Sequence, residues 1–237
     1  MAETTHRGSR GPLHGLRVVD VAAPLGAYVS RILGDLGADV IKIEPPSGDA
    51  ERTHEPCLAT GPNRLSLGFI HANVNKRSLI LDLKHPSAQE RFLELAARAD
   101  AVVSTENVAT WAARGIELER LSSFAPKLVW TSISPFGISG PYSAYTGNNF
   151  IAEAMAGLMY IQGDDTRPPC VSPYRQGIHL ASLHAVFGTL AALWERRTSG
   201  LGQVVEVTLQ EVLAHIYYAI VRYSSRHEIL RRTGTRN

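Results

Sequence analysis

The sequence predicts an α/β protein with a doubly wound, Rossmann-like fold, in which a mostly parallel sheet of about six strands carries helices on both faces. Two observations support this prediction. Short runs rich in β-branched residues recur along the chain, and apolar residues spaced three and four apart fill the segments between them. The chain of 237 residues, 44% of them hydrophobic and 19% charged, is long enough to enclose one large core.

The first strand and the first helix are defined by a change of period. A short Val-rich run at residues 16–21 predicts a strand. The next apolar residues recur at i, i+3, i+4 and i+7, and they are Val29, Ile32, Leu33 and Leu36. This spacing predicts an amphipathic helix, which we expect to end at Gly37 because glycine readily adopts the conformation that stops a helix. Residues 39–43 are the second expected strand.

A long segment without periodicity follows the second strand. Residues 45–76 contain Pro-Pro, several glycines and scattered polar residues, so we interpret them as a loop that could line a ligand site. Residues 79–83 resume as a strand. Ser87 is followed by Glu90 three residues later, which matches a capping box, and the helix that it opens is expected to reach about Arg98.

The second half of the chain continues the alternation. Residues 101–104, 128–133 and 204–207 are expected strands, and residues 150–159 are an expected helix. A long helix is indicated by five residues spaced 3, 4, 3 and 4 apart, namely Leu180, Leu183, Phe187, Leu190 and Trp194. We expect this stripe to face the core. A final helix is marked by Leu209, Val212, Leu213, Ile216 and Ile220.

Charge and cysteine content exclude several classes of protein. Lys and Arg number 24 against 22 Asp and Glu, a formal charge of +2 that is too small and too scattered for a nucleic-acid or membrane surface. Cys57 and Cys170 lie far apart and form no metal-binding spacing, so we expect two reduced thiols. Residues 1–10 are polar and no apolar run reaches about 18 residues, so the prediction is a cytoplasmic protein without a membrane partner.

Common nucleotide and metal motifs are also missing. Asp20 is followed by VAAPLG rather than a Gly-x-Gly-x-x-Gly turn, and no Walker-type Gly-Lys-Ser or Gly-Lys-Thr loop occurs, which disfavours an ordinary NAD or ATP site. The sequence contains no Gly-x-Ser-x-Gly elbow, which disfavours an esterase. Four histidines are the obvious candidate bases or ligands: His85, His179, His184 and His215. None of them has the spacing of a zinc site, so no metal is expected.

Several ordered segments carry a resemblance to a known family. They are DLGADVIKIEPP at residues 35–46 with Gly48 and Asp49, NKRSLILDLK at 75–84, Glu106 with Asn107, residues 132–142, and TSGLGQVVEV at 198–207. Together they resemble the family III CoA-transferases of the CaiB/BaiF type, from about residue 13 to the end of the chain. Known members form interlocked dimers and move CoA between carboxylic acids, or epimerise a 2-methylacyl-CoA in the racemase branch.

The resemblance implies a set of contacts to CoA, which would be a substrate, with no prosthetic group required. By position these contacts are Pro24, Leu25, Leu81, Asp82, Leu83, Lys84, Asn107 and Val108. A lysine such as Lys84 suits the nucleotide's phosphates as a mobile point charge, although on charge alone it also fits a solvated side chain before a helix. Arg114 is an inexact match to a CoA-contacting arginine, because the segment after Asn107 is shorter here.

The sequence departs from the family pattern at the catalytic position. In the transferases an aspartate near the start of the long helix attacks the acyl-CoA, and counting back without a gap from GTLAAL at 188–193 places Ile178 there. Asn148 stands where the racemases carry a histidine, so both members of that acid/base pair are missing. We therefore predict no catalytic residue on this chain. Asp164, Asp165 and Glu153 are the alternative carboxylates, interpreted mainly as surface residues.

These observations lead to a reading of the domains and the function. We expect a disordered tail at residues 1–12, the large domain at 13–226, and at 227–237 the start of a linker to a smaller domain that is missing here. The leading hypothesis is a CoA-transferase subunit that forms a homodimer or, to supply the missing aspartate, a heterodimer with an aspartate-bearing family member.

Two alternatives stay open besides the disfavoured racemase: a truncated, non-catalytic homologue or CoA-binding module, and an enzyme that uses a different carboxylate. The acyl substrate is not specified by the sequence. Four large apolar residues, Phe150, Met155, Met159 and Tyr160, suit either a bulky acyl group or the core.

Overall fold

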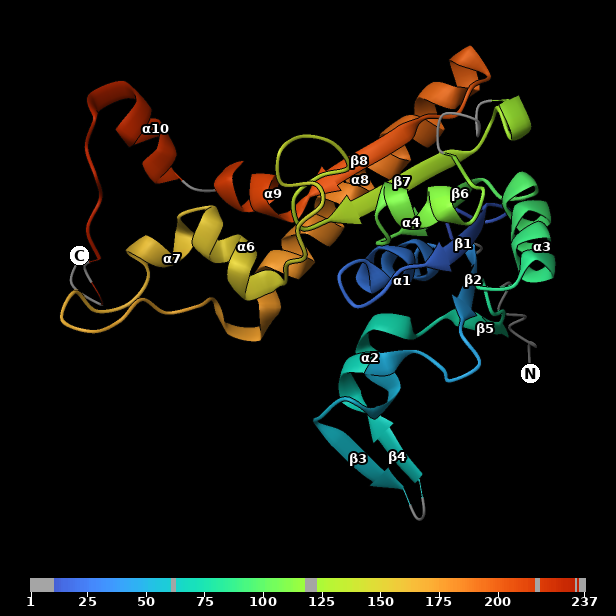
Figure 1. Ribbon diagram of the computed structural model, residues 1–237, viewed down its shortest axis with the longest axis horizontal. Coiled ribbons are helices and arrows are strands. Elements are labelled where there is room, and N and C mark those ends of the chain that lie inside the picture. The colour runs from blue at the N-terminus through green and yellow to red at the C-terminus, as the bar shows by residue number, and fades with distance from the viewer. Residues whose placement is uncertain (1–10, 61–62, 118–122, 216–217, 233, 235–237) are drawn as a thin grey trace, which may run out of the picture.

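A computed structural model describes residues 11–60, 63–117, 123–215, 218–232 and 234 (Figure 1). Its centre is a six-stranded sheet in the order β5-β2-β1-β6-β7-β8, in which every neighbouring pair is parallel. The strands are β1 (Arg17–Val21), β2 (Asp39–Glu44), β5 (Lys76–Ile80), β6 (Ala101–Ser104), β7 (Val129–Ser134) and β8 (Val204–Thr208). This is the strand order of a doubly wound sheet, so the predicted fold class is confirmed.

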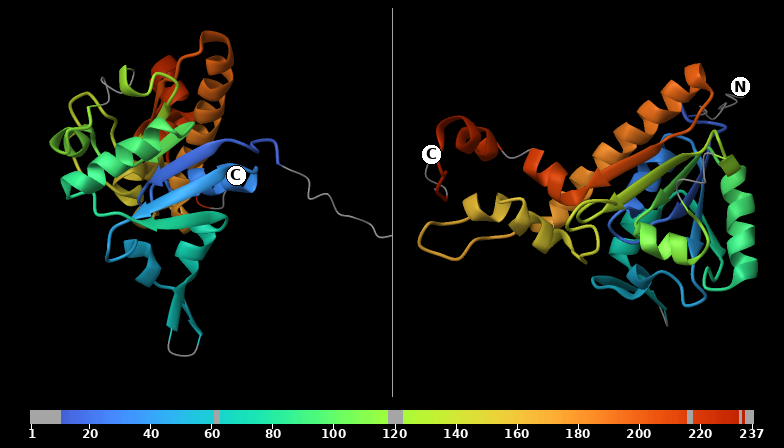
Figure 2. Two further views of the ribbon diagram at one scale, coloured as in Figure 1. Left: turned by 90° about the vertical axis from the view of Figure 1, so that its right-hand side faces the viewer. Right: turned by 45° about the horizontal axis from the view of Figure 1, so that its top comes forward.

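Helices cover both faces of the sheet. On one face lie α1 (Ala27–Asp35) and the long α8 (Gln176–Ser199), and on the other lie α3 (Pro86–Ala97) and α4 (Val108–Ala113) (Figures 1 and 2). Alternate strand residues supply the two cores because successive side chains point to opposite faces. Val18 packs in the core beneath α1 and α8, whereas its neighbour Val19 packs with Phe92, Trp111 and Trp130 on the other side. The adjacent inner strands β6 and β7 are fully buried, as parallel strands covered on both faces should be.

The segment between β2 and β5 is not the loop that the sequence predicts. It contains a 3-10 turn, η1 (Ala50–Thr53), the antiparallel hairpin of β3 (Cys57–Thr60) and β4 (Asn63–Ser66), and helix α2 (Leu67–Asn73). The hairpin projects away from the main sheet in Figure 1 and in the left view of Figure 2. These elements are too short to show a period. One available signal was Ser66, whose hydroxyl caps α2 by accepting the Phe69 N–H at 3.2 Å.

Two boundaries on either side of β5 differ from the prediction. The strand spans Lys76–Ile80 rather than residues 79–83, and the ammonium of Lys76 is buried in an ion pair with Asp20 instead of lying in solvent. The predicted capping box of Ser87 and Glu90 is wrong. Helix α3 starts two residues earlier, with His85 as its N-cap and Pro86 in its first turn, and His85 makes no side-chain capping bond.

The expected helix at 150–159 is divided in two. Helices α6 (Asn149–Met155) and α7 (Leu158–Ile161) are separated by Gly157, whose φ of 81° lies in the left-handed region. In the region of the expected final helix the structure describes α9 (Leu209–His215) and α10 (Tyr218–Arg226), and the predicted Ile216 lies outside the described residues. In Figures 1 and 2 these four helices extend from one end of the sheet.

The orientation predicted for the long helix α8 is wrong. Phe187 and Trp194 are 77% and 71% exposed, and the buried face instead consists mainly of small residues such as Ala181 and Ala185. Small side chains let the helix lie close to β7 and β8. A segment that includes it, Pro173–Ser199, is long and apolar enough to cross a membrane by length and composition alone. That is weak evidence, since core helices of soluble proteins pass the same test, and 44% of its most apolar window is buried.

Candidate functional site

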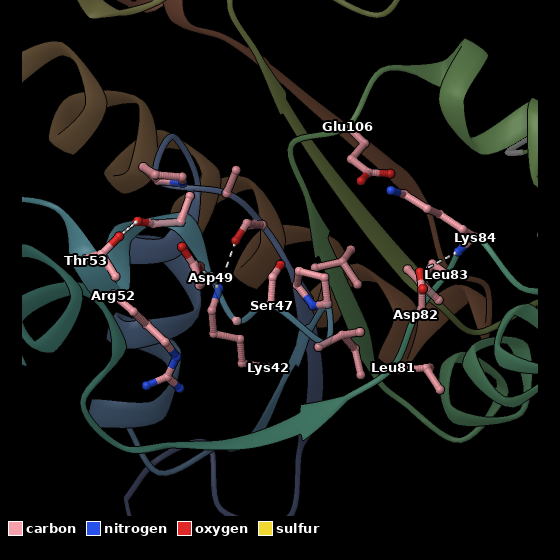
Figure 3. Close-up of a pocket in the computed structure, with 18 of the residues that line it drawn as sticks. Lys42, Ser47, Asp49, Arg52, Thr53, Leu81, Asp82, Leu83, Lys84 and Glu106 are labelled. Atoms are coloured by element: carbon pink, nitrogen blue, oxygen red, sulfur yellow. Dashed lines mark hydrogen bonds and ion pairs between the residues drawn. The ribbon is translucent and has the colours of Figure 1, made fainter.

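A cavity of about 590 Å³ lies at the carboxyl ends of the strands, next to the point where the strand order reverses between β1 and β6. Its walls come from the loop after β1, the segment Ser47–Thr53 after β2, and the segment Leu81–Lys84 after β5, together with Glu106 and Arg114. Figure 3 shows these side chains converging from separate loops. We call this space the switch-point cavity. In doubly wound sheets this is the place where ligands bind.

The structure gathers most, but not all, of the predicted CoA contacts at this cavity. Pro24 and the four residues Leu81, Asp82, Leu83 and Lys84 line it. Leu25 lines the next cavity instead. Asn107 and Val108 line neither this cavity nor the two cavities described below. Asn107 instead caps α4 by accepting the Thr110 N–H at 2.8 Å, and Val108 packs against the core.

Arg114, the inexact match, does line the switch-point cavity. Its guanidinium pairs with Glu106, and the Nη2–Oε1 contact measures 3.1 Å. The guanidinium also lies over the ring of Trp111, with 5.1 Å between Cζ and the ring centroid. Figure 3 shows the side chains of Lys84 and Glu106 pointing toward one another across the cavity. In this part of the wall Arg114 is paired with the carboxylate of Glu106, and Lys84 is a second cation that points toward the same place without an ion pair to another described residue.

A buried lysine joins two walls of the cavity. The ammonium of Lys42, on β2, is 2% exposed and lies 2.8 Å from the carboxylate of Asp49. It also donates to the carbonyl of Ala22 at 3.0 Å. Burial acts to lower the pKa of Lys42, but the charges of Asp20 and Asp49 outweigh it and raise that pKa above its usual value. The loop after β1 and the loop after β2 are thus fastened to the same charged group.

Asp20 anchors the other side of this network. It is fully buried at the end of β1, where it accepts hydrogen bonds from the Ala22 N–H at 2.8 Å and the Ser30 hydroxyl at 2.6 Å. Lys76 pairs with it at 2.8 Å. Burial favours a higher pKa for Asp20, yet the charges of Lys76 and Lys42 hold the pKa below its usual range. The carboxylate stays ionised and fixes the peptide that follows β1.

A second ion pair holds the loop after β2. Arg52 binds Glu44 through two hydrogen bonds of 2.6 and 2.7 Å, and the same carboxylate accepts from the Ser78 hydroxyl at 2.6 Å and the Asp49 N–H at 3.0 Å. The hydrogen bonds from Arg52 lower the pKa of Glu44 to about 2, against a smaller opposing effect of burial. Such fixed loops can present backbone groups to a ligand without rearranging.

Two further cavities meet at the start of α8, and Ile178 lines both of them. One, of about 680 Å³, is lined by Leu25, Asn148, Phe150 and neighbours, with no Asp or Glu among its described lining residues. The other, of about 510 Å³, lies against α2 and the loop after β2. We call them the α6 cavity and the α2 cavity. Pro24 lines these two and the switch-point cavity, so the three spaces adjoin one another.

Asn148, at the position of the racemase histidine, and its neighbour Asn149 both have structural partners. Asn148 caps α6 by accepting the Ile151 N–H at 3.1 Å. The amide of Asn149 accepts the Ile178 N–H at 3.2 Å and donates to Glu153 at 2.6 Å. Glu153 is fully buried and its second oxygen accepts the Ser172 N–H at 2.8 Å. Both oxygens of this alternative carboxylate are therefore engaged, and its interpretation as a surface residue is wrong because the side chain is buried in this hydrogen-bond network.

The other alternative carboxylates lie away from the three cavities. Asp164 and Asp165 line none of them, and Asp164 instead accepts from the N–H and hydroxyl of Thr166 at 2.9 and 2.6 Å. These bonds lower the pKa of Asp164. The carboxylates that do line the α2 cavity are Asp49, Glu51 and Glu55, none of which the sequence singled out as a nucleophile.

Several residues of the α2 cavity could not be placed from the sequence. The rings of Tyr28 and His71 stack with centroids 5.1 Å apart, and His179 meets the Tyr28 ring edge-on at 4.9 Å. Burial, followed by the neighbouring His71, lowers the pKa of His179. In the described part of the chain no group of three or more His, Cys, Asp or Glu could hold a metal ion.

Comparisons with known proteins agree on one family. The family model described as CoA-transferase family III matches residues 13–237. The chain is 35% identical over 199 residues to the succinyl-CoA:(R)-benzylsuccinate CoA-transferase subunit BbsE of Thauera aromatica, covering 84% of this chain and 48% of that protein. It is 34% identical to the formyl-CoA:oxalate CoA-transferase of Streptomyces avermitilis, covering 90% of this chain and 52% of that protein.

The solved structures agree with the sequence comparison. A CAIB/BAIF family protein from Brucella suis superposes with a TM-score of 0.90 at 31% identity, covering 95% of this chain and 60% of that one. The chain spans about half the length of the curated relatives that it matches.

Proposed function

The chain belongs to CoA-transferase family III, and from this premise we propose that it is a subunit that binds a CoA thioester and takes part in CoA transfer between carboxylic acids. We further propose that a partner chain supplies the catalytic aspartate. One observation carries this second proposal: Ile178, at the position that the resemblance assigns to the nucleophile, lies where two cavities meet beside the switch-point cavity. An isoleucine side chain has no atom that can attack a thioester.

The switch-point cavity supports binding of the nucleotide part of CoA. Its loops are already fixed by the Lys42 and Glu44 ion pairs, so little ordering accompanies binding. Lys84 is exposed at the rim, and its ammonium forms no hydrogen bond or ion pair with another described residue. That leaves it available for phosphate oxygens, for which a lysine acts as a mobile point charge.

The proposed chemistry requires a carboxylate from elsewhere. In the family's transferases the carboxylate oxygen bonds to the acyl carbon and the CoA thiolate leaves, which gives a mixed anhydride. The thiolate then attacks the aspartyl carbonyl and releases the first acid, leaving an aspartyl-CoA thioester that a second acid can resolve. On this chain Glu153 has both oxygens engaged, which argues against a replacement nucleophile. Asn148 caps α6 and has no proton to exchange at neutral pH, which argues against racemase chemistry.

The proposed pairing of this chain with a partner chain has support among the relatives. The Thauera protein is described as a subunit of its transferase, so at least one similar chain works in an assembly. We propose residues 13–226 as the large domain of this chain, with 227–237 leading toward a smaller one. A non-catalytic CoA-binding module is the competing reading, and it differs in having no partner.

The test of this proposal has two arms. Isothermal titration of CoA into the purified chain measures the binding half, and binding is expected. Co-expression with family members that carry the aspartate, followed by co-purification and an assay of CoA transfer from succinyl-CoA to a panel of acids, measures the other half. A chain that binds CoA but purifies alone from every such pairing is the non-catalytic module. Activity of the isolated chain that disappears in Asp164→Ala or Glu153→Ala would overturn the reading of Ile178.

A further inference from the structure

We propose that His179 is a general base with which this chain hydrolyses a CoA thioester by water, an activity separate from transfer to a second acid. The inference rests on the proposed function, because its substrate is a thioester bound at the switch-point cavity. His179 follows Ile178 in α8, and both residues line the α2 cavity. Pro24 and Asp49 line this cavity and the switch-point cavity, so a thioester that extends toward Ile178 meets the His179 ring. The other histidines that the sequence offers as candidate bases line none of the three cavities, and they are His85, His184 and His215.

The His179 ring is held by aromatic contacts that leave its nitrogen atoms free. The ring of Tyr28, from α1, lies 4.9 Å away at an interplanar angle of 83°, and the ring of His71, from α2, lies 5.7 Å away at 84°, both measured between centroids. The His179 side chain forms no hydrogen bond or ion pair with another residue in the described part of the chain, whereas Nδ1 of His184 lies 2.8 Å from the Leu180 carbonyl. Its nitrogens are thus available to a water molecule, as a general base requires.

The His179 ring is neutral near pH 7 and can therefore accept a proton. Burial, followed by the neighbouring His71, lowers the pKa of His179. The other titratable or charged residues that line the α2 cavity come from α1, the loop after β2 and the turn before α8, and they are Tyr28, Asp49, Glu51, His54, Glu55 and Arg175. The three carboxylates among them are paired with Lys42, Arg175 and Arg64 respectively, so none is an unpaired charge that would raise this pKa.

The turn before α8 supplies a cation for the negative charge that develops on the thioester oxygen. Arg175 lines both the α2 cavity and the α6 cavity, as Ile178 does. Its guanidinium has a single 3.3 Å hydrogen bond to Glu51 and lies 3.1 Å from Nε2 of His54, which leaves other N–H groups of its five to donate. Tyr174 and Arg175 have φ of 55° and 53°, and left-handed conformations of non-glycine residues concentrate at functional sites. A donor fixed beside a developing oxyanion is a large contribution to acyl-transfer catalysis.

The proposed reaction consumes only water and the thioester. The water oxygen bonds to the acyl carbon while one water proton passes to the His179 ring, and the carbonyl oxygen becomes an oxyanion. The carbon–sulfur bond then breaks, and the CoA sulfur takes the proton from His179, which gives the free acid and the CoA thiol. Ile178 offers no competing nucleophile at this point. The α2 cavity of about 510 Å³ has room for a water molecule, which occupies about 30 Å³.

Release of thiol from acetyl-CoA and butyryl-CoA by the full chain, without any acceptor acid, tests this activity. His179→Ala is expected to lower kcat/KM at least about 100-fold, as loss of a general base does, and added imidazole is expected to restore part of the rate. The Kd for CoA should stay unchanged in isothermal titration. His184→Gln is the matched control on the same helix and should keep the wild-type rate. The wild-type kcat/KM should rise with pH and level off by about pH 7, because His179 titrates below the usual 6.5.

The outcomes separate the base from the binding site. Release that survives in His179→Ala, a loss that imidazole does not restore, or a wild-type rate that keeps rising with hydroxide above about pH 7 overturns the role of His179. Circular dichroism checks folding, and if His179→Ala does not fold, His179→Gln takes its place with the wild-type pH profile as the second readout. A chain that binds CoA but releases no thiol overturns this inference alone. Failure to bind CoA overturns the proposed function and the inference with it.

Discussion

Replacement of Lys42 by methionine tests whether the buried ion network shapes the switch-point cavity or only stabilises the fold. The change keeps the apolar stem and removes the ammonium, which contacts Asp49 at 2.8 Å and the Ala22 carbonyl at 3.0 Å. Asp49 is only 9% exposed, so its charge would remain buried without its partner. Breaking a buried pair from one side costs about 3–5 kcal/mol, and we expect a loss of that size in the free energy of unfolding.

Lys76→Met is the matched control for this change. Lys76 is equally buried, and it pairs with Asp20 at 2.8 Å and donates to the Ala27 carbonyl and Asn73, but it does not line the switch-point cavity. We expect a similar loss of stability, again about 3–5 kcal/mol. The two variants should differ in CoA affinity, since Lys42 alone fastens two loops of the cavity wall.

Urea unfolding followed by circular dichroism gives the stability of both variants, and isothermal titration gives their Kd for CoA below the unfolding range. The double variant Lys42→Met/Asp49→Asn completes a thermodynamic cycle and should recover part of the loss, because it no longer buries an unpaired charge. A loss under about 1 kcal/mol for Lys42→Met would refute the buried network as a source of stability. Equal effects of both lysine variants on CoA affinity would refute the role of Lys42 in shaping the cavity.

Three further predictions concern pH, charge and packing. The pKa of Glu44 is lowered from 4.5 to about 2, so the stability it contributes is present above pH 4.5 and is lost as the pH falls toward 2. In Glu44→Gln an acid titration of the folded fraction should show a flatter decline over that range, and an unchanged profile would contradict the assignment. Lys84→Gln should weaken CoA binding by about two- to fivefold in low salt and less in high salt, since an exposed charge contributes at most about 1 kcal/mol. A Kd for CoA that changes neither with this substitution nor with the salt concentration would remove Lys84 from the site. Gly202→Ala should lower the free energy of unfolding in urea by more than about 3 kcal/mol, because the new Cβ would lie 1.9 Å from the Leu128 carbonyl oxygen. Gly200→Ala should cost only about 1 kcal/mol, because a Cβ there meets open space and only the φ of 75° is unfavourable. Similar losses in the two variants would contradict the close packing at Gly202.

The parallel sheet could be predicted because inner strands such as β6 and β7 are buried on both faces and therefore consist of runs rich in apolar and β-branched residues. Where a strand carries buried charge the signal fails, and β5 was placed three residues late because Lys76 resembles a surface residue in the sequence. Periodicity established that α8 is a helix but not which face is buried. The small residues of α8 pack against the core, and its large residues such as Phe187 and Trp194 remain exposed.

The site could be predicted only in part, for a related reason. Residues in short ordered motifs, such as Leu81 to Lys84, were located through the family resemblance. The meeting of Tyr28, His71 and His179 was not, because it depends on helix α2, whose segment has no periodic signal in the sequence. Contacts between distant segments become visible only when the chain is folded.

The central claim is that this chain needs a carboxylate from a partner. The direct measurement is CoA transfer from succinyl-CoA to a panel of acids by the isolated chain, by an aspartate-bearing family member that co-purifies with it, and by the two together. The account predicts transfer by the complex only, and its loss when the partner's aspartate is replaced by alanine. Transfer by the isolated chain at a rate comparable to that of the complex would contradict the account.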